Sequence, residues 1–326
     1  MIRMLLTGGT GFFGRALLRY LSSGQGGQRA QAYNEVIVLT RSPTKFLGSY
    51  PEFGGISWLK FCQGDITDLR SLEELSSLGK LHRVIHAATD STNTAKLNPL
   101  QQLDQIVDGT RNILQIAVKH GCERFLLTSS GAVYGPQPPD MGQIIETNLG
   151  SPDPLLPSST YGIGKRMAEH LCNIFNRTAQ VEVVIARCFA FVGKDLPLDK
   201  HFAIGNFVRE ALWADEIVVK GDGSPLRTYL DQDDLSNWLL TLLEKGRPGE
   251  AYNVGSDEVV SIADLAHLVR DLIAPNKPVR ILGKADPSHA RNRYVPDIAK
   301  ARRELGLNVT IPLTASIPRS VEGRLT

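Results

Sequence analysis

The sequence has no long apolar run, no surplus of either charge and few cysteines, and each absence removes a class of function. Its 36 basic and 34 acidic residues leave a net charge of +2, which gives no reason to expect nucleic-acid binding. No stretch is long and apolar enough to span a bilayer. The chain begins directly with an apolar strand-like run, which leaves no room for a cleavable signal. We therefore expect a cytoplasmic protein whose partners include neither nucleic acid nor membrane.

The cysteines, repeats and length set further bounds. Cys62, Cys122, Cys172 and Cys188 lack the close spacing of metal ligands, so we expect reduced thiols and no metal. Neither an internal repeat nor a low-complexity tail is present, and 326 residues suggest one or two domains.

What the sequence does contain is an alternation of strand-like and helical patterns. Such alternation predicts an α/β fold with a doubly wound parallel sheet and right-handed crossovers, as in a Rossmann fold. The apolar strand-like runs lie near 2–7, 35–40, 57–62, 83–88, 123–128 and 182–189.

A glycine-rich turn follows the first of these runs and precedes an amphipathic helix. Gly8, Gly11 and Gly14 permit a tight turn, close approach of the backbone to a pyrophosphate, and close helix–strand packing. The helix N-terminus then offers free N–H groups to phosphate. Three glycines alone also suit an ordinary loop, but their position at a strand-to-helix junction favours a dinucleotide site.

The end of the second run bears on the choice of nicotinamide cofactor. A site that prefers NAD usually has an acidic residue here for the ribose 2′-hydroxyl. Thr40-Arg41-Ser42 has none, and the Arg41 guanidinium suits a 2′-phosphate. A solvated surface arginine is the alternative. The sequence favours NADP over NAD.

Tyr161 and Lys165 stand four residues apart, a spacing that places two side chains on one helix face. An ammonium beside a phenol favours the phenolate and lowers the tyrosine pKa from about 10 toward neutrality. Such a tyrosine can exchange a proton with a sugar hydroxyl during hydride transfer. By itself the spacing also fits an exposed helix face, and Ser130 by itself fits a hydroxyl that caps a strand end.

Together these segments resemble the extended short-chain dehydrogenase/reductase family of NAD(P)-dependent nucleotide-sugar epimerases, dehydratases and reductases. The resemblance covers nearly the whole chain and includes Asp65-Ile66, His86-Ala87-Ala88, the 221–227 turn and Ala251-Tyr252-Asn253-Val254-Gly255. It implies Tyr161 as general acid/base, Ser130 on the reacting oxygen because it stands four residues before Tyr134, and Lys165 on both Tyr161 and the nicotinamide ribose. The expected cofactor contacts are Gly8, Gly11, Phe12, Phe13, Gly14, Arg41, Asp65, Ile66, Ala87, Ala88, Tyr161 and Lys165.

The resemblance also implies a substrate site and a discontinuous domain. Arg227 is expected on the substrate diphosphate, with Arg293 or Arg291 as a second cation and Asn206 as a hydrogen-bond donor; an unliganded surface residue is the alternative for each. The sheet domain would comprise 1–189 and about 227–255, and a smaller C-terminal α/β substrate lobe about 190–226 and 256–326. Helices near 99–120 and 160–178 would form a homodimer contact, unless their apolar faces only cover the sheet.

Departures from the family pattern reduce the number of reactions that the resemblance allows. Dehydratases of this family usually carry an acidic pair after the catalytic hydroxyl, and this chain has Gly131 and Ala132, so dehydration is not expected. Ala190 replaces an asparagine that often contacts substrate, which leaves the sugar open. The leading hypothesis is therefore an NADP-dependent 4-keto-sugar reductase. A C4 epimerase that keeps NAD bound is the second hypothesis, and a non-catalytic NADP-sensing protein ranks third.

Overall fold

The computed structural model describes residues 2–23, 32–89, 98–200, 202–284, 286 and 290–324. The chain divides into two compact units. The first comprises Met1–Val133, Pro152–Arg187 and Ser236–Tyr252, and the second comprises Tyr134–Ser151, Cys188–Leu235 and Asn253–Thr326. Strands β6 and β11 and helix α6 each begin in one unit and end in the other. Among the described residues, no helix combines the length and apolar character that crossing a lipid bilayer requires.

A seven-stranded sheet forms the centre of the first unit, in the order β11-β6-β5-β4-β1-β2-β3. Strand β1 pairs in parallel with β2 and β4, β2 with β3, and β4 with β5. The predicted doubly wound α/β fold is confirmed, and all six predicted strands form. Their bounds are β1 (Ile2–Thr7), β2 (Tyr33–Thr40), β3 (Leu59–Gln63), β4 (Arg83–His86), β5 (Arg124–Ser130) and β6 (Glu182–Cys188), with β11 (Ala251–Val254) as the seventh.

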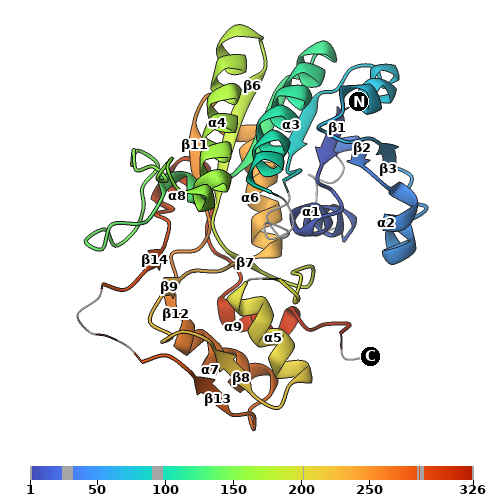
Figure 1. The fold of residues 1–326 in the computed structure, drawn as a ribbon. Coiled ribbons are helices and arrows are strands. Elements are labelled where there is room, and N and C mark those ends of the chain that lie inside the picture. The colour runs from blue at the N-terminus through green and yellow to red at the C-terminus, as the bar shows by residue number, and fades with distance from the viewer. Residues whose placement is uncertain are drawn as a thin grey trace. The chain divides into compact units, whose positions relative to one another are not determined.

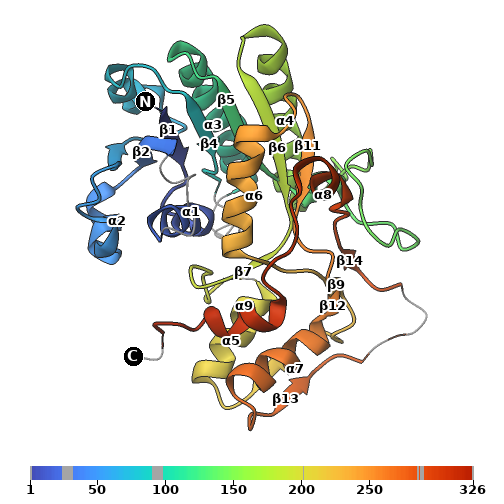
Figure 2. The same ribbon diagram turned by 180° about the vertical axis from the view of Figure 1, so that it is seen from behind.

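Sheet register explains the core. Ile37, Leu5, Val84 and Phe125 stand opposite one another on four adjacent strands, so their side chains share one face. All four are buried. Helices α3 (Pro99–Lys119) and α4 (Thr160–Thr178) cover this face with their apolar sides, and they lie in front of the sheet in Figure 1. The view from behind, in Figure 2, shows α6 (Gln232–Lys245) on the opposite face.

A glycine on each of these two helices permits a close contact. A Cβ on Gly164 of α4 would lie 3.0 Å from Ile106 of α3, and one on Gly109 of α3 would lie 2.5 Å from Ile66, in the turn after β3. Asn98 and Gln101 form a capping box at the start of α3, which fixes where that helix begins. The remaining elements of the first unit are α1 (Phe12–Ser22), α2 (Pro43–Ser49), η2 (Pro51–Phe53), η3 (Leu69–Ser77), η5 (Pro157–Ser159) and most of η4 (Gly131–Tyr134).

The second unit contains three small sheets and four helices among its described residues. Its ladders are β7 with β10, β12-β9-β14, and β13 with β8. The strands are β7 (Phe191–Val192), β8 (Ile217–Val219), β9 (Leu226–Arg227), β10 (Leu230–Asp231), β12 (Val260–Ser261), β13 (Val279–Ile281) and β14 (Arg293–Tyr294). The helices are α5 (Ala203–Trp213), α7 (Ile262–Ile273), α8 (Ala299–Leu305) and α9 (Leu313–Arg319).

Candidate active site

The glycine loop between β1 and α1 is built by close contacts that leave one glycine open to solvent. Gly8 has φ +71°, and a Cβ there would lie 2.4 Å from the Ala87 carbonyl oxygen. A Cβ on Gly14 would lie 2.2 Å from Gly9 Cα. Gly11 is exposed, is the N-cap of α1, and makes no side-chain cap hydrogen bond. The first turn of α1 can therefore present its N–H groups to an anion such as a pyrophosphate.

A one-way chain of hydrogen bonds runs beneath this loop. Thr110 donates to the Ile106 carbonyl at 2.6 Å, so its oxygen accepts from His86 Nε2–H at 3.2 Å. Nδ1 of His86 then accepts from the Thr7 hydroxyl at 2.8 Å, and Thr7 accepts from the Ala88 N–H. Burial, with a smaller contribution from Lys165, lowers the pKa of His86 to about 3. His86 is thus a neutral residue with a structural role.

The other expected cofactor residues lie at the carboxyl ends of the strands or just beyond them. Arg41 is exposed after β2, and in the described part of the chain its side chain has no recorded partner. Asp65 accepts from the Thr67 N–H and hydroxyl at 2.9 and 2.8 Å, which fixes the turn after β3. Ile66 is buried, and its carbonyl accepts from Asn112 at 2.8 Å. Ala87 and Ala88 are half-buried after β4, and Phe12 and Phe13 are half-buried in the first turn of α1.

Lys165 is anchored to the strand that carries Ser130. It is buried, and its ammonium donates to the Thr128 carbonyl and to the Thr89 hydroxyl, each at 2.8 Å. The same Nζ lies 5.9 Å from the centroid of the Tyr161 ring. The predicted side-by-side arrangement of Tyr161 and Lys165 is therefore present in the structure. A positive charge fixed close to the phenol favours its ionised form.

Ser130 ends β5 and is held against the first turn of α4 by its neighbours. Its Oγ accepts from the Ala132 N–H at 3.1 Å, which turns the chain sharply after the strand. The Val133 carbonyl accepts from Arg166 at 2.9 Å. A Cβ on Gly162 would lie 2.6 Å from the Ala132 carbonyl oxygen, so only glycine permits this approach. These contacts bring the Ser130 turn and the Tyr161 turn together.

Next to Ser130, Ser129 belongs to a buried charged cluster that the sequence did not reveal. Ser129 donates to Glu169 at 2.5 Å. Arg187 of β6 donates two hydrogen bonds to the same carboxylate, from Nε at 3.0 Å and from Nη2 at 2.7 Å. Glu169 lies one helical turn after Lys165 on α4, and this spacing is the only feature of the sequence that could have placed Glu169 near the site.

The expected substrate residues lie in the second unit. Arg227 of β9 pairs with Tyr294 of β14, while Arg293 stands opposite Leu226. Arg227 and Tyr294 therefore share one face of the ladder and Arg293 faces the other. Burial lowers the pKa of the half-buried Arg227, and Tyr294 lies 4.6 Å from the ring of Phe189. Asn206 lies half-buried in the first turn of α5.

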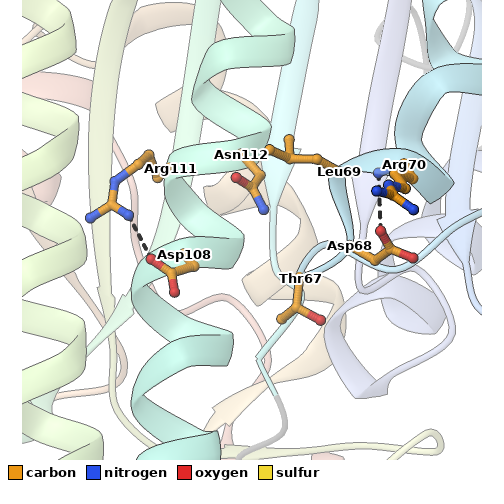
Figure 3. A pocket seen from close by; sticks show the side chains of 7 residues that line it. All are labelled: Thr67, Asp68, Leu69, Arg70, Asp108, Arg111 and Asn112. Carbon is orange, nitrogen blue, oxygen red and sulfur yellow. Dashed lines mark hydrogen bonds and ion pairs between the residues drawn. The ribbon is translucent and has the colours of Figure 1, made fainter.

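A shallow groove of about 600 Å³ lies beside the Asp65–Ile66 turn (Figure 3). Arg111 pairs with Asp108 at 2.6 Å, and Asp68 accepts a hydrogen bond from the Arg70 backbone N–H at 3.0 Å. Its lining residues are Thr67, Asp68, Leu69, Arg70, Asp108, Arg111 and Asn112.

Residues 4–255 match the family described as "NAD dependent epimerase/dehydratase family". This range includes the glycine loop, Ser130, Tyr161 and Lys165. The chain belongs to the NAD dependent epimerase/dehydratase family. UDP-glucuronic acid decarboxylase 1 of Arabidopsis thaliana is 32% identical to it over 328 residues, which covers 98% of this chain and 69% of the plant protein.

Two solved structures that are similar to this chain hold different nicotinamide cofactors. The dTDP-glucose 4,6-dehydratase DesIV of Streptomyces venezuelae, solved with NAD, is 28% identical with a TM-score of 0.81 and covers 98% of this chain and 96% of its own. RMD of Pseudomonas aeruginosa, solved with NADPH, is 25% identical with a TM-score of 0.78 and covers 98% of both chains.

Proposed function

We propose that this family member transfers a hydride to or from C4 of the sugar in a nucleoside-diphosphate sugar, with Tyr161 as the acid/base. The observation that carries this proposal is the Lys165 ammonium, fixed at 2.8 Å to the Thr128 carbonyl and 5.9 Å from the Tyr161 ring. This anchoring keeps a positive charge beside the phenol and next to the strand end that carries Ser130. A nicotinamide, when bound, supplies or accepts the hydride.

In the reductive direction each residue has one task. Ser130 donates a hydrogen bond to the carbonyl oxygen at C4. As C4 gains the hydride, Tyr161 passes its phenolic proton to that oxygen, and Lys165 stabilises the resulting phenolate. Oxidation runs through the same steps in reverse. The glycine loop and the first turn of α1 support the proposal that a dinucleotide binds here, because the N-cap residue Gly11 has no side chain to cover the N–H groups of that turn.

Two features favour a 4-keto-sugar reductase that uses NADPH. Gly131 and Ala132 carry no proton-transferring group beside Ser130, which argues against elimination of water. Arg41 is exposed at the end of β2, where a 2′-phosphate would find a guanidinium. The similar structures include one with NADPH and one with NAD, so the fold does not distinguish the two cofactors. The proposed preference for NADPH therefore depends on Arg41 alone.

A second candidate is oxidative decarboxylation of a nucleotide uronate, and the similarity to the plant decarboxylase favours it. Oxidation at C4 would make a β-keto acid. The C5–C6 bond then breaks, its electron pair passes to the C4 oxygen as an enolate, and CO₂ leaves. Protonation at C5 and return of the hydride to C4 complete the reaction. This sequence also needs no acidic pair after Ser130.

Three assays on the purified protein separate these reactions. A reductase consumes one NADPH for each 4-keto sugar nucleotide reduced. A decarboxylase releases CO₂ from a UDP-uronate with no net conversion of NAD⁺ to NADH, and a C4 epimerase interconverts UDP-hexoses with neither CO₂ release nor net conversion of the cofactor. Absence of NADPH consumption, together with either of the other two results, would reject the reductase.

We further propose that the second unit binds the substrate and that the protein is a cytoplasmic homodimer. Arg227, Arg293 and Asn206 are the proposed diphosphate and nucleotide contacts. The outer faces of α3 and α4 support a dimer contact, because they expose the apolar side chains of Val118, Met167 and Ile174. Light scattering of the wild type and of Met167→Glu tests this contact, and a monomeric wild type would contradict it.

A further inference from the structure

The buried cluster of Ser129, Glu169 and Arg187 joins three elements at the proposed catalytic site. Ser129 is the next-to-last residue of β5 and directly precedes Ser130. Glu169 lies on α4, and Arg187 lies on β6. Glu169 is 9% exposed and accepts hydrogen bonds from both partners. The cluster therefore fixes the strand end that carries Ser130 to the helix that carries Tyr161 and Lys165.

Stability alone is a poor explanation for such a cluster. Removing two charges from water costs as much as their attraction returns, so apolar residues of similar size often serve the core at least as well. Two neighbouring positions on α4 are occupied by small apolar side chains: Ala168 and Cys172 are fully buried. A charged pair at this place in the core points to a requirement other than packing.

The charge of Glu169 reaches the space around Lys165. Burial raises the pKa of the Cys172 thiol most, Glu169 raises it further and Lys165 lowers it, so both charges act on this group. His86 of β4, whose pKa Lys165 also lowers, and Arg187 of β6, which pairs with Glu169, face the same region. Arg187 thus compensates a negative charge that would otherwise oppose the effect of Lys165.

We propose that Glu169 and Arg187, linked to Ser129, are positioning residues for the Ser130, Tyr161 and Lys165 site: they hold Ser130 in register with α4, and Arg187 neutralises Glu169 so that the field of Lys165 acts on Tyr161. This inference rests on the proposed function for its catalytic part. Its electrostatic part can be measured without any substrate.

The first experiment titrates the Tyr161 phenol by ultraviolet difference absorbance, using the full-length protein. Each variant is compared with the same variant carrying Tyr161→Phe, which isolates one of the eight tyrosines. Glu169→Gln leaves the positive charge of Arg187 uncompensated and lowers the pKa of Tyr161. Arg187→Met leaves the negative charge of Glu169 and raises it. Eight residues of helix place Glu169 about 12 Å from Tyr161, so each shift is about 0.5–1 pH unit.

Two controls accompany this titration. Glu169→Met combined with Arg187→Met removes both charges, so the pKa of Tyr161 returns to about the wild-type value. Glu123→Gln removes a carboxylate that pairs with Lys80 and Arg83 at the opposite end of β5, and it leaves Tyr161 unchanged. Shifts of the same sign in Glu169→Gln and Arg187→Met, or none in either, would overturn the electrostatic part of the proposal.

The second experiment tests register through turnover. Ser129→Ala keeps the ion pair, so the protein folds, but it removes the hydrogen bond to Glu169. We expect kcat to fall about fivefold with an unchanged KM for NADPH. Ser129→Thr retains the hydroxyl and restores most of kcat. An unchanged kcat in Ser129→Ala would reject the role of the serine.

The two experiments keep separate failures apart. If no nucleotide sugar is turned over, the proposed function fails while the opposite shifts of the Tyr161 pKa can still be observed. If turnover is found but the shifts are absent, only the positioning role of Glu169 and Arg187 fails. Where one single variant unfolds, the other single variant supplies the shift, and the double Met variant supplies the unshifted reference, because replacing both partners leaves no buried charge unpaired.

Discussion

Replacing Lys165 by Met tests the electrostatic centre of the proposed site. The ammonium lies 5.9 Å from the Tyr161 ring centroid, and Lys165 as a residue is 3% exposed, so water screens its charge little. At an effective dielectric constant of about 20, a unit charge at this distance stabilises the phenolate by about 3 kcal/mol. That energy corresponds to a change of about two units in the tyrosine pKa.

The assay is the pH dependence of kcat/KM for reduction of a 4-keto sugar nucleotide. Tyr161 donates a proton in this direction, so activity falls as pH rises through its pKa. Lys165→Met raises that pKa, and the alkaline limb of the profile therefore moves upward by about two pH units. The rate on the plateau also falls, because Thr89 and the Thr128 carbonyl lose their donor.

The matched control is Lys165→Arg, which keeps a positive charge on α4. We expect its alkaline limb to stay close to the wild-type position even if the plateau rate is lower. Thermal unfolding of all three proteins checks that each is folded at the assay temperature. An alkaline limb that is unmoved in Lys165→Met would refute the claim that this ammonium sets the pKa of Tyr161.

Three further predictions follow from the cofactor loop and the core. Arg41→Ala raises the Kd for NADPH by about 10- to 100-fold and leaves the Kd for NADH unchanged, because it removes a charge-assisted contact of about 1.5–3 kcal/mol. Fluorescence titration measures both Kd values. Equal increases in the two Kd values would exclude a contact between Arg41 and the 2′-phosphate. His86 has a folded pKa of about 3, below the ordinary value of 6.5, so its contribution to the free energy of unfolding is present above pH 6.5 and is lost as pH falls toward 3. Denaturant unfolding across this range should show a smaller decrease in the free energy of unfolding with falling pH in His86→Gln than in the wild type. The same pH dependence in both proteins would contradict the neutral state of His86. Gly162→Ala places a Cβ 2.6 Å from the Ala132 carbonyl oxygen and lowers kcat by about 100-fold, whereas Gly48→Ala on α2 meets no atom within 4 Å and leaves kcat unchanged; a fully active Gly162→Ala protein would show that the Tyr161 turn tolerates displacement.

Much of the fold could be predicted because the central strands are buried on both faces. Such strands are continuous apolar runs in the sequence, and β1, β2 and β5 illustrate this with almost entirely buried residues. Strand β11 has only four residues, Ala251–Val254, and its own pattern does not distinguish it from a loop. Only the resemblance to a family indicated that this segment returns to the sheet.

The proximity of Tyr161 and Lys165 could be predicted because a helical spacing of four fixes which side chains are neighbours. The anchors of Lys165 could not, since a backbone carbonyl such as that of Thr128 leaves no trace in the pattern of residue types. The pairing of Glu169 with Arg187 joins α4 to β6 and depends on the packed structure.

The strand register also decides facts that the sequence leaves open. Arg227 and Arg293 are both candidate contacts of the substrate diphosphate. The β9–β14 register places Tyr294 opposite Arg227 and Arg293 opposite Leu226, so the two arginines lie on different faces of the ladder. A shift of one residue would reverse this arrangement. Spacing along the chain contains no information about which residue of one strand faces which residue of another.

Transfer of deuterium from NADPH labelled at C4 of the nicotinamide tests the central claim most directly. The wild-type protein, incubated with a 4-keto sugar nucleotide, is expected to place one deuterium on C4 of the sugar, as detected by mass spectrometry and NMR. Tyr161→Phe should reduce the rate of labelling by about 10²–10⁴-fold, the usual contribution of a general acid. A product without deuterium at C4, or full labelling by Tyr161→Phe, would contradict the account.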